Sequence, residues 1–168
     1  MLKTVQRFCP DEGCTRSVGE KLARVSQAPL RLYLSGPLGA GKSALVRAFL
    51  RALGVQGPIK SPSYALVEPY AFSSYSVYHF DFYRFFDQNE WVESGFRDNF
   101  EEHALCLVEW PEKAAGVLPP ADLLLHLAYA PINEAQPEVL TARQITLSAH
   151  TPTGLDTLNR FELLDAKE

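Results

Sequence analysis

The spacing of apolar residues along the chain follows two patterns. One is the short, mostly apolar run, which is typical of a buried strand. The runs with this character are 30–35, 104–110, 122–130 and 144–149. The other pattern repeats every three to four positions and predicts a helix. It covers 15–27, the segment from Ser43 to Gly54, and 153–164.

The middle of the chain carries a different arrangement. Two β-rich runs, 64–70 and 75–81, are joined by a short segment rich in serine, which predicts a hairpin and hence a local antiparallel pair. A helical pattern at 89–100 is interrupted at Gly95. Strands that alternate with helices predict an α/β fold. We expect three αβα layers around a mixed, mostly parallel sheet, with antiparallel pairing at the hairpin.

Composition narrows the class of protein. A chain of 168 residues with 46% hydrophobic residues fits a single domain, so we expect residues 1–168 to form one. The net charge of −4 gives no basic footprint for direct nucleic-acid binding, so a role near RNA would act through a partner. No apolar run approaches a membrane span, and the N-terminus has no apolar signal segment. We therefore expect a cytoplasmic protein.

The cysteines Cys9, Cys14 and Cys106 form no CxxC pair and are odd in number. This pattern argues against a disulfide framework and against a zinc knuckle. Cys106 lies within an apolar run, so we expect it to be buried as a small hydrophobic residue.

The segment 36–43 reads GPLGAGKS and follows the pattern GxxxxGK[ST] between a predicted strand and a predicted helix. In such a loop the backbone amides and the helix N-terminus bind phosphate oxygens. Lys42 is expected to reach the β- and γ-phosphates, and the Ser43 hydroxyl is expected to be a ligand of Mg²⁺. The predicted nucleotide contacts are Gly36, Leu38, Gly39, Ala40, Gly41, Lys42 and Ser43.

Two acids end apolar runs, where phosphate-binding-loop proteins place the groups that hold Mg²⁺ and orient water. Asp81 ends one run, and Glu109 ends another in the manner of a Walker B strand. We expect Ser43, Asp81 and Glu109 to hold the metal, and Lys42, Asp81 and Glu109 to act in catalysis. The alternative for each acid is an ordinary solvated side chain at the tip of a strand.

Neighbouring residues allow more than one interpretation. Ser61 and Ser63 fit either a hydroxyl-bearing switch that senses the γ-phosphate or a simple turn. His79 and Tyr83 alternate with phenylalanines, so either fits plain strand packing, and Arg84 fits a phosphate contact or a surface ion pair. Trp110 fits a partner surface or the core.

Four segments in this order resemble the TsaE family, also known as YjeE, which is the ATPase of bacterial tRNA threonylcarbamoyladenosine synthesis. They are LGAGKS at 38–43, KSPSYALVEPY at 60–70, YHFDFYR at 78–84 and LVEWPE at 107–112. The resemblance extends over nearly the whole chain, from Asp11 to Ala149. Ser43 stands where the family has threonine, which keeps the hydroxyl, whereas Ala65 lacks the usual one.

The resemblance implies a P-loop NTPase fold, slow ATP hydrolysis with Mg²⁺, and work in a complex with the proteins TsaD and TsaB. The ATPase would support turnover of that complex without transferring the threonylcarbamoyl group, and it would meet tRNA only through the complex. Thr15 lies where the family contacts the nucleotide. The segment 131–141 is longer than the family pattern implies, so the match of Arg143 to a nucleotide-proximal arginine stays open.

Other functions remain open on the residues alone, because the loop motif does not separate a hydrolase from a kinase. The absence of an Asn-Lys-x-Asp guanine-recognition motif favours ATP over GTP. A small-molecule kinase would need a lid with clustered arginines, but Arg47, Arg51, Arg84 and Arg97 are scattered. A third alternative is an interaction module that binds nucleotide without turnover.

Overall fold

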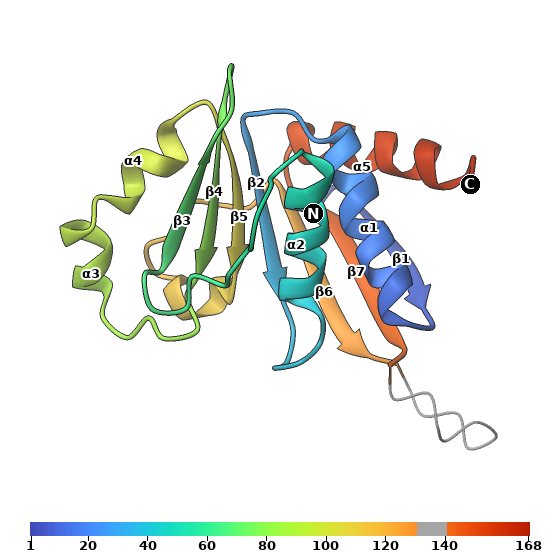
Figure 1. Ribbon diagram of the computed structural model, residues 1–168, viewed down its shortest axis with the longest axis horizontal. Coiled ribbons are helices and arrows are strands. Elements are labelled where there is room, and N and C mark those ends of the chain that lie inside the picture. Colours follow the sequence, from blue (N-terminus) through green and yellow to red (C-terminus); the bar gives the residue numbers. More distant parts are fainter. Residues whose placement is uncertain (131–140) are drawn as a thin grey trace.

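One mixed sheet forms the centre of the computed structural model, which describes residues 1–130 and 141–168 (Figure 1). Its strands lie in the order β1-β7-β6-β2-β5-β4-β3. The strands are β1 (Lys3–Cys9), β2 (Leu30–Ser35), β3 (Val67–Ala71), β4 (Ser76–Asp81), β5 (Ala104–Glu109), β6 (Leu123–Tyr129) and β7 (Arg143–Ala149). The helices are α1 (Glu12–Val25), α2 (Lys42–Ala52), α3 (Gln88–Glu93), α4 (Phe96–Glu101), α5 (Pro152–Asp165) and the short 3-10 helix η1 (Pro111–Ala114).

The pairing of the strands confirms the mixed sheet and the predicted hairpin. Strands β4, β5, β2 and β6 run parallel to one another, and β3 pairs antiparallel with β4. Antiparallel pairing extends beyond the hairpin, because β7 lies antiparallel between β1 and β6. The parallel strands therefore occupy the middle of the sheet, with antiparallel strands on both sides.

Helices cover both faces of the sheet, which confirms the three-layer prediction. Helices α1, α2 and α5 pack on one face through residues such as Leu22, Phe49 and Phe161. On the other face, α3, α4 and η1 cover part of the sheet around a cluster of aromatic side chains that includes Phe80 and Phe100. Strand β5 is buried on both faces, as is typical of a central parallel strand. Glu109, the last residue of β5, is therefore held by a strand that is packed on both faces.

Strand β1 was not predicted from the sequence. It forms an edge of the sheet and pairs with β7 alone among the described strands. Only Val5 and Cys9 of this strand are buried, whereas most of its other side chains are polar and at least partly exposed. An edge strand with so few buried residues leaves little alternation of apolar and polar residues to detect.

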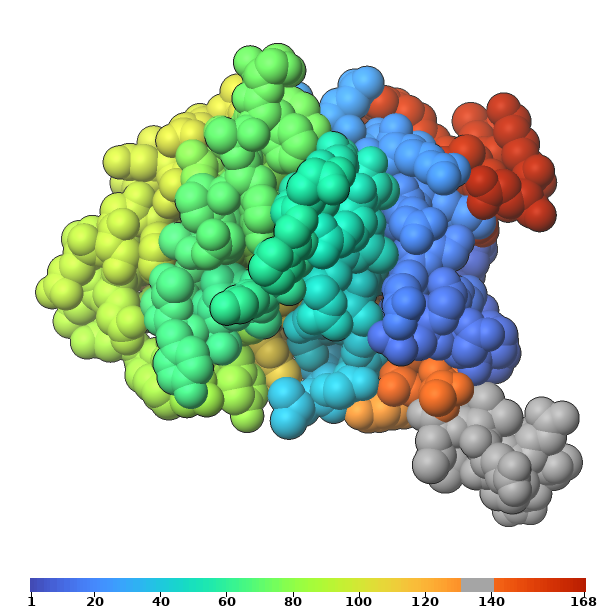
Figure 2. Space-filling view, in the orientation of Figure 1, coloured from blue at the N-terminus to red at the C-terminus, as the bar shows by residue number. Residues whose placement is uncertain are grey.

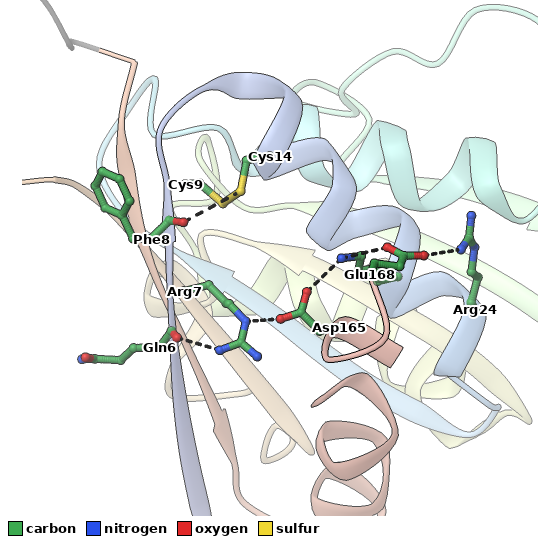
Figure 3. A network of polar contacts seen from close by, with 9 residues as sticks. Gln6, Arg7, Phe8, Cys9, Cys14, Arg24, Asp165 and Glu168 are labelled. Carbon is green, nitrogen blue, oxygen red and sulfur yellow. Dashed lines mark hydrogen bonds and ion pairs between the residues drawn. A yellow bond between two sulfur atoms is a disulfide. The ribbon is translucent and has the colours of Figure 1, made fainter. Parts of the chain in front are cut away.

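The cysteines correct another expectation. Cys9 and Cys14 form a disulfide, with their Cα atoms 5.2 Å apart (Figure 3). The odd count and the missing CxxC pair had argued against one, but the tight turn from the end of β1 into α1 brings the two residues within disulfide range. Cys106 is buried as expected, and burial raises the pKa of its thiol to about 12.

A cluster of ion pairs fixes the C-terminal end of the chain to β1 and α1. Arg7 donates to Asp165 (Figure 3). The Nζ atom of Lys21 lies 2.9 Å from a carboxylate oxygen of Asp165 and 2.9 Å from one of Glu168. Burial alone would raise the pKa of Asp165, but the hydrogen bonds from Lys21 and Arg7 outweigh it and lower that pKa. The charged form of Asp165 is thus favoured by folding.

We expect Asp165→Asn to lower the free energy of unfolding by about 1 kcal/mol at neutral pH. Because the folded pKa lies below the unfolded value, this contribution is present above the unfolded pKa and is lost as the pH falls through the folded pKa. Urea unfolding at neutral and at strongly acidic pH measures the difference between variant and wild type. Asp156→Asn, at an exposed ion pair with Arg160, is the matched control and should change little. An equal deficit at both pH values would contradict the charge argument.

The expected cytoplasmic location stays a prediction. Within residues 1–130 and 141–168, no helix combines the length and the apolar character that a membrane span requires.

Candidate nucleotide-binding site

The loop 36–41 connects the carboxyl end of β2 to the start of α2, as the motif predicted. A side chain at Gly36 would collide with the carbonyl oxygen of Leu127, because an added Cβ would lie 2.2 Å from it. Gly41 is the N-cap of α2 with a φ of 106°, a conformation that glycine adopts without strain. In Figure 2 the loop is exposed at the lower edge of the molecule. Both positions therefore favour glycine, in agreement with the sequence motif.

The first turn of α2 has the properties of an anion site. Its N-cap, Gly41, supplies no side-chain hydrogen bond to the amides of that turn. Unsatisfied amides at a helix N-terminus, together with the helix dipole, attract phosphate groups. The predicted contacts Gly39, Ala40 and Gly41 line the cavities on both sides of the loop, while the Leu38 side chain is exposed.

Lys42 is buried and folds back over the loop. Its Nζ atom donates to the carbonyl oxygens of Gly36, at 2.6 Å, and Pro37, at 3.0 Å. The ammonium group also lies 4.0 Å from the centre of the Trp110 ring. Burial lowers the pKa of Lys42, and the nearby acids, Glu109 foremost, oppose that effect. A phosphate anion would be a stronger partner for this ammonium than two neutral carbonyls.

The two predicted acids lie side by side at the carboxyl ends of parallel strands. Asp81 of β4 and Glu109 of β5 are paired in register, and both are buried. The hydroxyl of Ser43 donates to Glu109 Oε1 at 2.8 Å. The structure therefore joins the start of α2 to the end of β5, and the alternative of a solvated Glu109 is excluded.

Asp81 is held by a different set of partners. Ser61 donates its hydroxyl to Asp81 Oδ2 at 2.6 Å, and the Tyr83 amide donates to Oδ1 at 3.0 Å. Ser61 comes from the loop that the sequence offered as either a switch or a simple turn. Its contact with Asp81 connects that loop to the site, whereas no hydrogen bond joins Asp81 to Ser43 within the described residues.

The side chains of other residues considered from the sequence make no hydrogen bond to the two acids within the described part of the chain. The Arg84 guanidinium lies 4.4 Å from the centre of the Tyr64 ring, and the Tyr83 and Trp110 rings are 5.0 Å apart. Ser63 is half-buried in the loop after Ser61. The structure thus places Trp110 over Lys42 and Arg84 over an exposed tyrosine.

His79 was open to interpretation as simple strand packing, but the structure gives it a partner in the site. Its Nε2 atom lies 2.7 Å from Glu109 Oε2, and both side chains are buried. His79 is two positions before Asp81 on β4, so the two side chains lie on the same face of the strand. That spacing was visible in the sequence, but the proximity of His79 to Glu109 was not.

Two cavities flank the loop and share Gly39, Ala40 and Gly41. One, of about 220 Å³, is also lined by Lys42, Ser43, Arg47, Glu109 and Trp110. The other, of about 280 Å³, is also lined by Glu12, Thr15, Thr141 and Arg143. Together they offer space on both sides of the loop.

Thr15 and Arg143 lie on the side of the loop away from Ser43. Thr15 is buried, and within the described residues its hydroxyl oxygen has no hydrogen-bond partner. Arg143 donates to the carbonyl oxygens of Ala40, at 3.1 Å, and Gly39, at 3.2 Å. Arg143 therefore reaches the loop, while its match to a nucleotide-proximal arginine stays a prediction. Of the predicted segment 131–141, residues 131–140 lie outside the described residues.

A larger cavity, of about 400 Å³, lies apart from these residues. Its lining is mainly apolar and includes Tyr33, Leu118 and Leu124. It contains neither the loop nor the paired acids. Size alone therefore does not mark the site.

The donor set at Ser43 suits Mg²⁺. Within the described residues no group of three or more His, Cys, Asp and Glu side chains could hold a metal ion. The Ser43 hydroxyl and the Glu109 carboxylate, with Asp81 beside it, instead supply a few oxygen atoms. Mg²⁺ typically takes one or two protein carboxylates and completes its shell with phosphates and water. The residues therefore fit this ion.

The family model and the related proteins found by comparison name the same family. The family model described as "Threonylcarbamoyl adenosine biosynthesis protein TsaE" matches residues 9–138. The Haemophilus influenzae tRNA threonylcarbamoyladenosine biosynthesis protein TsaE is 37% identical over 165 residues, covering 95% of this chain and 99% of that protein. The Bacillus subtilis protein of the same name is 30% identical over 155 residues, covering 92% and 86%.

A solved structure supports the same fold. The crystal structure of Bacillus subtilis YdiB matches with a TM-score of 0.77 and 22% identity, covering 98% of each chain. The fold is that of a P-loop NTPase, with the glycine loop between β2 and α2. With the family model matching most of its length, the chain belongs to the TsaE family of tRNA threonylcarbamoyladenosine biosynthesis proteins.

Proposed function

We propose that this protein binds ATP with Mg²⁺ and hydrolyses it slowly, as a switch that supports turnover of the TsaD–TsaB complex in tRNA threonylcarbamoyladenosine formation. The observation that carries the proposal is the 2.8 Å hydrogen bond between Ser43 and Glu109. It places the hydroxyl that ends the phosphate-binding loop against a buried carboxylate from a neighbouring strand. A glycine-rich turn that matched the motif by coincidence would not be expected to make this contact.

Each residue has a task in this proposal. The loop amides and Lys42 bind the β- and γ-phosphates, and Ser43 and Glu109 hold the metal ion. Mg²⁺, when bound, would neutralise charge that develops on the phosphates. Asp81 accepts a hydrogen bond from Ser61 at one oxygen and from the Tyr83 amide at the other. In this proposal it helps to arrange the metal ion or the attacking water. Through its hydrogen bond to Asp81, Ser61 would link the conformation of the loop 60–66 to whether the γ-phosphate is present.

The choice of ATP rests on the sequence. No Asn-Lys-x-Asp motif for guanine recognition occurs in the chain. The cavity lined by Thr15 and Arg143 lies across the loop from Ser43 and would accept the nucleoside side of the ligand. Calorimetry with ATP and GTP should show binding of ATP in preference to GTP.

The experiment that tests the proposal follows the fate of the γ-phosphate. The purified protein is incubated with ATP and Mg²⁺, with and without TsaD and TsaB, and free phosphate and threonylcarbamoyl transfer to tRNA are both measured. We expect slow release of free phosphate and multiple turnovers of the modification only when this protein is present. ATP binding without any effect on the modification would contradict the proposed role. A phosphorylated small molecule in place of free phosphate would indicate a kinase instead.

Thr15→Val should separate binding from stability. Valine matches the shape of threonine but lacks the hydroxyl, which is buried without a partner among the described residues. We expect about 5-fold weaker ATP binding, which is the value of one neutral hydrogen bond. Stability should be unchanged or higher by about 1 kcal/mol, because a buried polar group is removed.

Calorimetry and thermal unfolding together measure these two effects. Thr15→Ser keeps the hydroxyl and is the matched control, with ATP affinity expected near that of the wild type. Equal affinities of Thr15→Val and wild type for ATP would exclude Thr15 from the nucleotide site.

A further inference from the structure

Glu109 is held from two sides. Its Oε1 atom accepts a hydrogen bond from Ser43 at 2.8 Å, and its Oε2 atom lies 2.7 Å from His79 Nε2. Glu109 and His79 are each 1% exposed, so neither water nor another solvent-exposed group competes freely for these atoms. The imidazole thus fixes the rotation of the carboxylate that directs Oε1 toward Ser43.

The other nitrogen of His79 shows which tautomer is present. Nδ1 is buried and has no hydrogen-bond partner within the described residues. A proton on Nδ1 would be a buried donor without an acceptor, whereas a proton on Nε2 has the Glu109 carboxylate to bind. The geometry therefore favours a proton on Nε2, which makes His79 a hydrogen-bond donor to Glu109.

This contact gains importance when the nucleotide is bound. The Ser43 hydroxyl would then serve the metal ion, as in other phosphate-binding loops, and would no longer be free to fix Glu109. Within the described residues His79 has no hydrogen bond to the loop, so it would keep its hydrogen bond to Glu109 when the loop binds the nucleotide. It is the remaining donor that holds the carboxylate in place.

We propose that His79 is a positioning residue that orients Glu109 for the metal ion and the triphosphate. The proposal rests on the proposed function, because it gives His79 a role in the same site. Partners that orient a metal-binding side chain typically affect metal affinity or activity by 10- to 100-fold. A histidine that only fills the core would have no such effect.

Two amide variants separate the roles of the ring nitrogens. His79→Gln can place its amide nitrogen where Nε2 lies, whereas the shorter His79→Asn places it nearer to Nδ1 and away from Glu109. Both introduce the same polar group at one buried position, so their thermal unfolding reports any shared loss of stability. His103→Gln, at an exposed histidine between α4 and β5, is a further control.

The first readout is metal binding, with Mn²⁺ and ADP as the probe and electron paramagnetic resonance as the measurement. We expect about 10-fold weaker Mn²⁺ binding for His79→Asn and recovery to within about 3-fold of wild type for His79→Gln. In steady-state hydrolysis the Asn variant should lose kcat while its KM for ATP changes little. Folded Asn and Gln variants that both bind Mn²⁺ as the wild type does would overturn the proposal.

The second readout does not depend on nucleotide at all. Nitrogen NMR of ¹⁵N-histidine-labelled protein, assigned with His79→Gln, should show a proton on Nε2 of His79. Glu109→Gln should shift the Nε2 resonance. An Nε2 without a proton in the wild type would refute the assignment to Glu109. If the wild type binds neither ATP nor Mn²⁺ with ADP, the proposed function fails, while these resonances still decide whether His79 holds Glu109.

Discussion

Replacing Glu109 by glutamine should reduce ATP hydrolysis by about 100-fold while nucleotide binding is retained. The substitution preserves shape and removes the charge of a carboxylate that is 1% exposed and hydrogen-bonded to Ser43. Binding should persist because the loop amides and Lys42 remain in place. Phosphate release measures the first effect, and calorimetry with a non-hydrolysable ATP analogue measures the second.

Glu112→Gln is the matched control for this prediction. Glu112 lies in η1, just after β5, and its side chain is exposed. The Glu112→Gln substitution removes one negative charge from the same part of the chain and leaves the hydrogen bond between Ser43 and Glu109 in place. We expect near-normal hydrolysis. Unchanged turnover in Glu109→Gln would favour a module that binds nucleotide without hydrolysing it.

Lys42→Ala should weaken ATP binding by about 10- to 100-fold. The ammonium would form charge-assisted hydrogen bonds to phosphate, each with a value of about 1.5–3 kcal/mol. Among the described residues its hydrogen bonds go to the neutral carbonyls of Gly36 and Pro37. Titration calorimetry with ATP and Mg²⁺ gives the dissociation constant directly.

Two controls accompany the Lys42 measurement. Lys113→Ala removes an exposed lysine of η1 and should leave ATP affinity unchanged. Thermal unfolding of Lys42→Ala checks that the loop retains its structure after losing the two carbonyl contacts. Wild-type affinity in a folded Lys42→Ala variant would refute the phosphate-binding assignment.

The parts of the site that the sequence predicted are those that local order determines. The glycine loop lies between a strand and a helix in the chain, so its place at the start of α2 follows from neighbouring residues. Asp81 and Glu109 each end an apolar run, and the carboxyl ends of parallel strands lie at one edge of a sheet. The positions of the loop and of the two acids follow from the order of strands and helices along the chain, and the sequence pattern predicted that order.

The parts that the sequence did not predict depend on pairing between distant segments. His79 and Glu109 come from different strands, and their contact depends on the register of β4 against β5. Arg143 reaches the loop only because β7 lies beside β6. The Cys9–Cys14 disulfide depends on the tight turn after β1, a strand that was itself too weakly patterned to predict.

A crystal structure with Mg²⁺ and a non-hydrolysable ATP analogue tests the central claim most directly. We predict the β- and γ-phosphates within the loop 36–43 against Lys42, and the metal ion bound by Ser43 with Glu109 and Asp81 beside it. The nucleoside should lie on the side of Thr15 and Arg143. Phosphates bound away from the loop, or a metal ion distant from Ser43 and Glu109, would contradict the account.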